Sequence, residues 1–139
     1  MQDAILLLAR ILLMLLFLVF GWNKLTQYDA TVSYMAQTGL PFPSLAALVA
    51  IAIEFFLALV IVVGAWTRPL AVLFALYSLA TALTGHHFWT MEGATRYANA
   101  INFYKNLGLT GGFLLLYVTG PGRYSLDARR SRSVATQSR

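Results

Sequence analysis

Four apolar segments restrict the fold of this chain more than any other feature. They cover residues 4–22, 44–64, 69–88 and 101–119. Each is close to the roughly 20 residues that an α-helix needs to cross about 30 Å of hydrocarbon. Lipid offers no partners for backbone N–H and C=O groups, so each segment is expected to satisfy them internally as a helix. We therefore predict an all-α integral membrane bundle with four transmembrane helices.

The composition supports a membrane protein. Of the 139 residues, 59% are hydrophobic and 11% are charged, whereas a soluble domain carries about 25% charged residues. The first segment is not interpreted as a signal peptide, because it lacks a basic start and Arg10 interrupts its apolar run. The chain has no cysteine, which excludes disulfides, thiolate catalysis and cysteine-bound metals. The basic excess is concentrated near the C-terminus, so nucleic-acid binding is not predicted.

The polar connections predict two further elements. Between the first two apolar segments, Val32, Met35 and Ala36 recur at helical spacing, which indicates a short interfacial helix between helices one and two. After the last apolar segment, residues 127–139 are basic and rich in serine, and such a composition is typical of a disordered tail. The predicted division is thus a membrane domain over 1–126 and a tail over 127–139.

The distribution of Lys and Arg predicts the orientation. An even number of crossings places both termini on one side, and excess basic residues mark the cytoplasmic side. Only Lys24 and Arg96 are expected at the opposite end. We therefore predict a multi-pass protein with both termini in the cytoplasm. The basic residues on the tail side are Arg68, Arg123, Arg129, Arg130, Arg132 and Arg139.

Three ionisable residues lie inside the apolar segments: Arg10, Glu54 and Lys105. Each costs about 2.5–3.5 kcal/mol near the bilayer centre unless it has a partner or water. Counting from the cytoplasmic helix ends, Arg10 and Glu54 differ in depth by about 6 Å. This predicts an Arg10–Glu54 ion pair inside the bundle. The alternative is that Arg10 extends to the interface and Glu54 is protonated.

A polar cluster is predicted in the outer half of the bundle, and its candidate ligand-binding residues surround Glu54. Adjacent histidines on a helix project about 100° apart and cannot chelate one ion well, so no metal site is predicted. The cluster suits an amphipathic head group such as a quinone, an organic acid or a lipid. The alternative is an interfacial aromatic belt with extended lysines. The ligand-binding candidates are Lys24, His86, His87, Asn102 and Lys105.

Several motifs together resemble one family. They are LAR at 8–10 leading to GWNKL at 21–25, Glu54 followed by GAWTRP at 64–69, the histidine-bearing end of the third apolar segment, and GPGRYSLD at 120–127. In this combination the chain resembles the DoxX family of bacterial inner-membrane proteins over about residues 5–130. The resemblance implies a four-helix membrane bundle and a link to quinone-dependent redox chemistry. Arg10, Lys24 and Glu54 match the family pattern.

Three functions follow as hypotheses. In the first, the chain is an accessory subunit of a quinone-linked redox system, with no metal or flavin of its own, and quinone is the candidate cofactor. Glu54 and Arg10 would be its catalytic pair, and a redox partner protein is implied. In the second, it is a small-molecule carrier that dimerises through Gly108 and Gly112. In the third, it is a purely structural subunit whose basic tail docks on anionic lipid. The sequence leaves open whether the chain is itself an enzyme.

Overall fold

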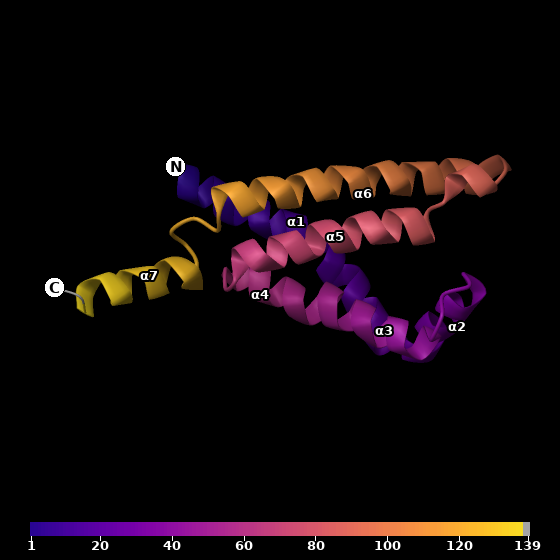
Figure 1. Cartoon of the computed structure of the whole chain (residues 1–139), viewed down its shortest axis with the longest axis horizontal. Helices are drawn as coiled ribbons and strands as arrows, with labels where there is room; N and C mark the ends of the chain where they lie inside the picture. Colours follow the sequence, from indigo (N-terminus) through magenta and orange to yellow (C-terminus); the bar gives the residue numbers. More distant parts are fainter. Residues whose placement is uncertain (138–139) are drawn as a thin grey trace. The chain divides into compact units, whose positions relative to one another are not determined.

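The computed structural model describes residues 1–137, and every regular element in that stretch is a helix (Figure 1). The all-α prediction is therefore confirmed. Two of the elements are not α-helices: η1 is a π-helix and η2 is a 3₁₀-helix. The elements are α1 (Gln2–Thr26), α2 (Tyr28–Gln37), α3 (Pro43–Ile51), η1 (Ala52–Leu57), α4 (Ala58–Val63), α5 (Thr67–Gly85), η2 (Phe88–Thr90), α6 (Gly93–Thr119) and α7 (Leu126–Gln137).

Three stretches of the described chain are long and apolar enough to cross a membrane. They are Gln2–Thr26, Pro43–Val63 and Thr67–Thr90, which match the first three predicted spans. Helix α6 has 27 residues, and its length is sufficient. Polar residues in its first half, such as Asn102 and Lys105, lower its apolarity. The fourth crossing therefore stays a prediction.

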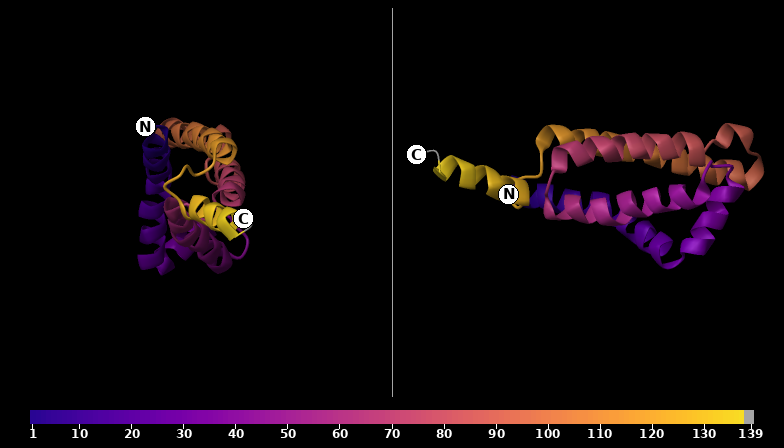
Figure 2. Two further views of the ribbon diagram at one scale, coloured as in Figure 1. Left: turned by 90° about the vertical axis from the view of Figure 1, so that its left-hand side faces the viewer. Right: turned by 60° about the horizontal axis from the view of Figure 1, so that its bottom comes forward.

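The chain forms two compact units, residues 1–67 with 121–139 and residues 68–120. In the first unit, α1 packs along the continuous rod formed by α3, η1 and α4, and α2 folds back onto α3 (Figure 2). Met35 of α2 is buried with Ala47 and Ala50 of α3, and Val32 packs against them. The predicted short helix thus exists as α2, and its place in the membrane interface stays a prediction.

The second apolar segment is not a uniform helix. Residues Ala52–Leu57 form the π-helical stretch η1, and Glu54 lies within it. Isolated π-helical turns inside α-helices occur frequently at functional sites. Helix α4 then ends at Gly64, which has a φ of 73°. This left-handed end is the type that glycine adopts without a steric cost.

The predicted disordered tail is corrected in part, because residues Leu126–Gln137 form helix α7. The helix start is capped: the Ala128 N–H donates to the Ser125 hydroxyl oxygen at 3.2 Å, as expected of an N-cap serine. The hydroxyls of Ser131 and Ser133 donate to main-chain carbonyls within the helix. Composition alone favoured disorder because it does not register such local caps. Ser138 and Arg139 lie outside the described residues.

In the second unit, α5 and α6 lie side by side (Figures 1 and 2). The rings of Phe74 and Phe113 meet with centroids 5.2 Å apart. The Asn106 amide donates to the Thr81 hydroxyl oxygen at 3.4 Å. At the connecting end, η2 and the first half of α6 bring four aromatic rings together in mostly edge-to-face contacts: Phe88, Trp89, Phe103 and Tyr104.

Candidate functional site

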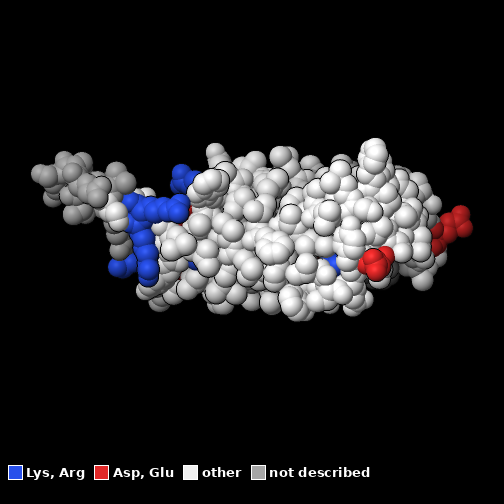
Figure 3. Space-filling model, turned by 90° about the horizontal axis from the view of Figure 1, so that it is seen from below, with Lys and Arg blue, Asp and Glu red and all other residues white. Residues whose placement is uncertain are grey.

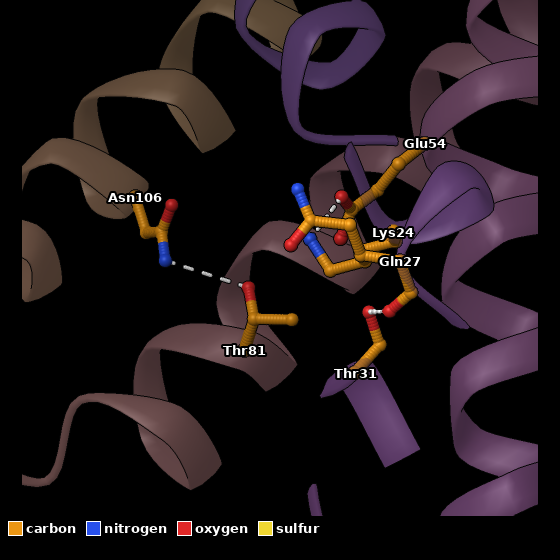
Figure 4. Close-up of polar contacts among 6 residues, drawn as sticks. All are labelled: Lys24, Gln27, Thr31, Glu54, Thr81 and Asn106. Atoms are coloured by element: carbon orange, nitrogen blue, oxygen red, sulfur yellow. Dashed lines mark hydrogen bonds and ion pairs between the residues drawn. The ribbon is translucent and has the colours of Figure 1, made fainter. Parts of the chain in front are cut away.

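An ion pair joins α1 to the π-helical stretch. The Lys24 Nζ lies 2.6 Å from Glu54 Oε2 (Figure 4). The Glu54 side chain is 10% exposed and the Lys24 side chain is 26% exposed. Glu54 is therefore held inside the first unit, where the low dielectric strengthens its attraction to the ammonium group. This pair is the candidate functional site of the chain.

Gly21 allows α1 to approach the π-helical stretch closely enough for this pair. A Cβ at position 21 would stand 2.7 Å from both the Glu54 carbonyl carbon and the Phe55 nitrogen. Real Cβ atoms essentially never come within 3.0 Å of such atoms. Gly21 and Lys24 are three residues apart and share one helix face. The close approach at Gly21 thus aims the Lys24 side chain at Glu54.

Aromatic rings lie beside the ion pair and between the two elements that carry it. The Lys24 ammonium lies 5.9 Å from the centroid of the Phe20 ring, a distance at which a cation interacts favourably with a ring face. The Trp22 and Phe55 rings are 5.6 Å apart between centroids. The second contact joins the same two elements, α1 and η1, that the ion pair joins.

The predicted Arg10–Glu54 ion pair is wrong. Arg10 is 1% exposed, and its guanidinium donates to three main-chain carbonyl oxygens, those of Val62, Pro121 and Tyr124. The positions of Arg10 and Glu54 along their helices explain the error. Since Gly21 faces Glu54, Arg10 lies about 16 Å along α1 from the carboxylate. Helix α1 begins at Gln2, and Arg10 lies in its first half. There its guanidinium meets Val62 near the end of α4 rather than Glu54 deeper in the bundle.

A second polar cluster holds residues 120–127, which we call the clasp. The Asp3 carboxylate accepts the Arg123 main-chain N–H at 2.9 Å. The Asp127 carboxylate accepts the Trp66 and Thr67 main-chain N–H groups, each at 2.9 Å. In return, the Asp127 N–H donates to the Gly64 carbonyl oxygen at 2.9 Å. With Arg10, these bonds join the clasp to the ends of α1 and α4.

The electrostatics of Asp127 reflect these bonds. Partial burial by itself would raise the pKa of Asp127. The hydrogen bonds from the main-chain N–H groups of Thr67 and Trp66 and the positive charge of Arg130 together lower the pKa by more than burial raises it. The net effect is a pKa below the ordinary value. Sequence reasoning singled out the GPGRYSLD motif but did not assign roles to Asp3 or Asp127. Both carboxylates accept main-chain N–H groups of segments far away in the sequence, for which the sequence carries no local signal.

The remaining predicted site residues belong to the second unit. The His86 Nδ1 lies 3.0 Å from the Asn99 Oδ1, and the His87 Nδ1 lies 3.0 Å from the Thr84 carbonyl oxygen. Asn102 is half-buried and Lys105 is exposed on α6. The structure thus brings Lys24 and Glu54 together, and the wider cluster stays a prediction. Among the described residues, no group of three or more His, Asp or Glu could hold a metal ion.

Comparison with known proteins assigns the family. The DoxX family model matches residues 5–87. This chain belongs to the DoxX family. It is similar to the inner membrane protein YphA of Escherichia coli strain K12, with 52% identity over 92% of this chain and 91% of that protein. It is also similar to the inner membrane protein YqjF of the same strain, with 42% identity over 91% and 92% of the two chains. No solved structure matches it.

The DoxX membership and the apolar helices identify an inner-membrane protein in contact with the lipid bilayer. In this DoxX chain, Arg10, Lys24 and Glu54 divide into two groups at two levels of the first unit. Arg10 is fully engaged by carbonyl oxygens, so it is suited to holding the fold. Lys24 and Glu54 combine a hydrogen-bond donor, a proton-accepting group and partial access, so they are suited to binding and proton transfer.

Proposed function

We propose that this DoxX-family protein is an accessory subunit of a quinone-linked membrane redox system. In this proposal the Lys24–Glu54 pair binds the head group of a quinone or a small organic anion. The observation that supports it is a carboxylate and an ammonium group paired at 2.6 Å within stretches apolar enough to span a membrane. Ionisable residues inside membrane spans are costly, and they usually mark ligand or proton pathways.

The two side chains supply complementary chemistry. A quinone takes up two electrons and two protons when it is reduced to a quinol. The Lys24 ammonium can donate a hydrogen bond to a carbonyl oxygen or attract a carboxylate. In this proposal the Glu54 carboxylate exchanges a proton with the bound head group. The electrons come from a redox partner protein, which the proposal requires.

The topology forms part of the same proposal. Helix α6 would make a fourth crossing, and both termini would lie in the cytoplasm, as the excess of Arg near the clasp and α7 indicates. The Lys24 end of α1 would then face outward. Reporter fusions after residues 26, 67, 92 and 137 test this arrangement. An enzyme active only in the cytoplasm should report at 67 and 137, and one active only outside should report at 26 and 92; any other pattern contradicts the topology.

Binding of a short-chain ubiquinone to the purified full-length protein tests the function. We expect saturable binding whose Kd rises at least about tenfold in Glu54→Gln and Lys24→Gln, since each loses a hydrogen bond to a charged group. Glu92→Gln is the matched control, because Glu92 is an exposed acid at the start of α6. The same assay measures any contribution of His86 or Lys105. Absence of binding, or an equal loss in the control, would contradict the proposal.

A structural role is the second candidate, and the close approach at Gly21 supports it. The ion pair joins α1 to η1 at the point where their main chains meet, so it helps to hold these helices in register. Under this alternative, Glu54→Gln lowers the yield of folded protein and its melting temperature but leaves quinone and organic-anion binding undetectable in every variant. Uptake into vesicles distinguishes the further alternative of a small-molecule carrier.

A further inference from the structure

The connection between α4 and α5 must lie at one face of the bilayer. Two stretches apolar enough to span a membrane, Pro43–Val63 and Thr67–Thr90, are separated only by Gly64, Ala65 and Trp66. A connection this short between two spans reverses the chain within the head-group layer, which is about 5–7 Å thick on each side of the hydrocarbon. The depth of Trp66 is thereby fixed by the spans on either side of it.

Trp66 combines a left-handed backbone with a side chain that has little contact inside the protein. Its φ is 49°, in the left-handed region that is rare for a bulky residue. Its side chain is nevertheless 66% exposed, so the indole gains little burial against the protein in return. Indole rings are enriched at membrane interfaces, where the apolar ring and the N–H group are both accommodated. Strain combined with exposure at this depth indicates that lipid supplies the missing contact.

The clasp brings positive charge to the same level. Because Asp127 accepts the N–H groups of Trp66 and Thr67, the start of α7 is fixed beside the turn. Arg129 and Arg130 follow Asp127 by about 3–4.5 Å of helix rise, which leaves them within the head-group layer. Both side chains are exposed, as is that of Arg123. Figure 3 shows Lys and Arg side chains gathered near α7 on the face displayed.

The acidic groups of this region face the protein. The Asp3 and Asp127 carboxylates both accept main-chain N–H groups, while the arginines point to the exterior. The Arg123 guanidinium lies 6.0 Å from the centroid of the Tyr124 ring, and that ring is 55% exposed. We call the exposed set of Trp66, Arg123, Tyr124, Arg129 and Arg130 the turn surface.

We propose that the turn surface binds the head groups of anionic phospholipids in the leaflet that it faces. Guanidinium groups donate paired hydrogen bonds to phosphate oxygens, and each basic residue near an anionic membrane surface strengthens attachment. The aromatic rings of Trp66 and Tyr124 would pack beside the glycerol region. The binding is electrostatic and interfacial, and it is independent of any ligand at the Lys24–Glu54 pair.

Thermal unfolding of the full-length protein in lipid nanodiscs tests this proposal. We compare discs of phosphatidylcholine with discs of an equal mixture of phosphatidylcholine and phosphatidylglycerol. The wild-type protein should melt at a higher temperature in the anionic discs, and salt should reduce the difference. The double variant Arg129→Gln/Arg130→Gln should lose most of the difference. Arg96→Gln, an exposed arginine of the second unit, should retain it.

Three results of the unfolding experiment would overturn the proposal: no gain in anionic discs, an undiminished gain in the double variant, or an equal gain when inorganic phosphate is added to phosphatidylcholine discs. The last would mean that the surface binds a soluble anion.

Fluorescence gives a second measurement, because Trp22→Phe/Trp89→Phe leaves Trp66 as the only tryptophan. Lipids with a quencher near the head group should quench it more than lipids with a quencher deep in the chain; the reverse order contradicts the proposal.

Discussion

Gly21 and Glu54 meet through their main chains, in the place where a transmembrane-length helix packs against a π-helical stretch. An ideal Cβ on Gly21 would stand 2.7 Å from the Glu54 carbonyl carbon and 2.8 Å from its carbonyl oxygen. One turn later on the same face, Lys24 reaches the Glu54 carboxylate at 2.6 Å. The contact between main chains and the ion pair therefore depend on each other, and a change at the first should weaken the second.

Gly21→Ala should separate α1 from η1 and destabilise the protein by about 1–3 kcal/mol, the usual cost of overpacking. The clash involves main-chain atoms, which cannot move aside as a flexible side chain can. The measurement is thermal unfolding of the purified protein in detergent. Gly111→Ala is the matched control, because a Cβ at position 111 meets nothing within 4 Å. The control should be neutral or slightly stabilising; equal losses in both variants would contradict the argument.

Arg10→Met should be strongly destabilising. The substitution leaves the carbonyl oxygens of Val62, Pro121 and Tyr124 without the donor that they now share. Each buried acceptor left unpaired costs about 1–3 kcal/mol. We expect a loss of at least about 3 kcal/mol in unfolding free energy, with faster protease cleavage in residues 120–127. Arg10→Lys should rescue little, because an ammonium group cannot match the planar fork of the guanidinium. Lys105→Met, at an exposed residue, is the control.

The sequence was sufficient to predict helices in the four apolar segments, because these segments are long and their ends are marked by glycine and proline. Gly64 and Gly120 do end α4 and α6, with φ values of 73° and 75°. The π-helical stretch was not predicted, because its residues have the same apolar pattern as a regular helix. Its one distinctive residue, Glu54, was recognised as functionally important on the cost of burying charge.

The partner of Glu54 was predicted wrongly for a geometric reason. Arg10 and Lys24 both lie on the buried side of α1, so periodicity did not distinguish them. Only the relative level of α1 and the second span decides which cation meets the carboxylate. That level is set by the main-chain contact at Gly21, which composition and spacing do not reveal. The clasp was missed because its bonds use main-chain groups, whose positions follow from the folded chain alone.

Asp127 should make the docking of α7 sensitive to acid. The pKa of Asp127 is lowered in the folded protein, so the carboxylate stabilises the fold above its unfolded pKa of about 3.9. This contribution is lost as the pH falls through the lower folded value. Asp127→Asn should have a lower melting temperature than the wild type at pH 7. The two melting temperatures should converge as the pH falls below the folded pKa of Asp127. The measurement is the melting temperature of both proteins from pH 7 downward through the folded pKa. A difference that stays constant with pH would contradict the prediction.

At position 66 the glycine variant should be more stable than the alanine variant, whereas within helices alanine is usually the more stabilising of the two. Both variants remove the indole, but only glycine relieves the left-handed backbone at a φ of 49°. In detergent, Trp66→Gly should therefore be more stable than Trp66→Ala by about 1 kcal/mol, allowing for the extra chain entropy of glycine. Leu45 in α3 is the matched control, because it is exposed within a regular helix. There glycine should be the less stable variant by about 0.5–1 kcal/mol. The same order at both positions would show that the Trp66 backbone is not strained.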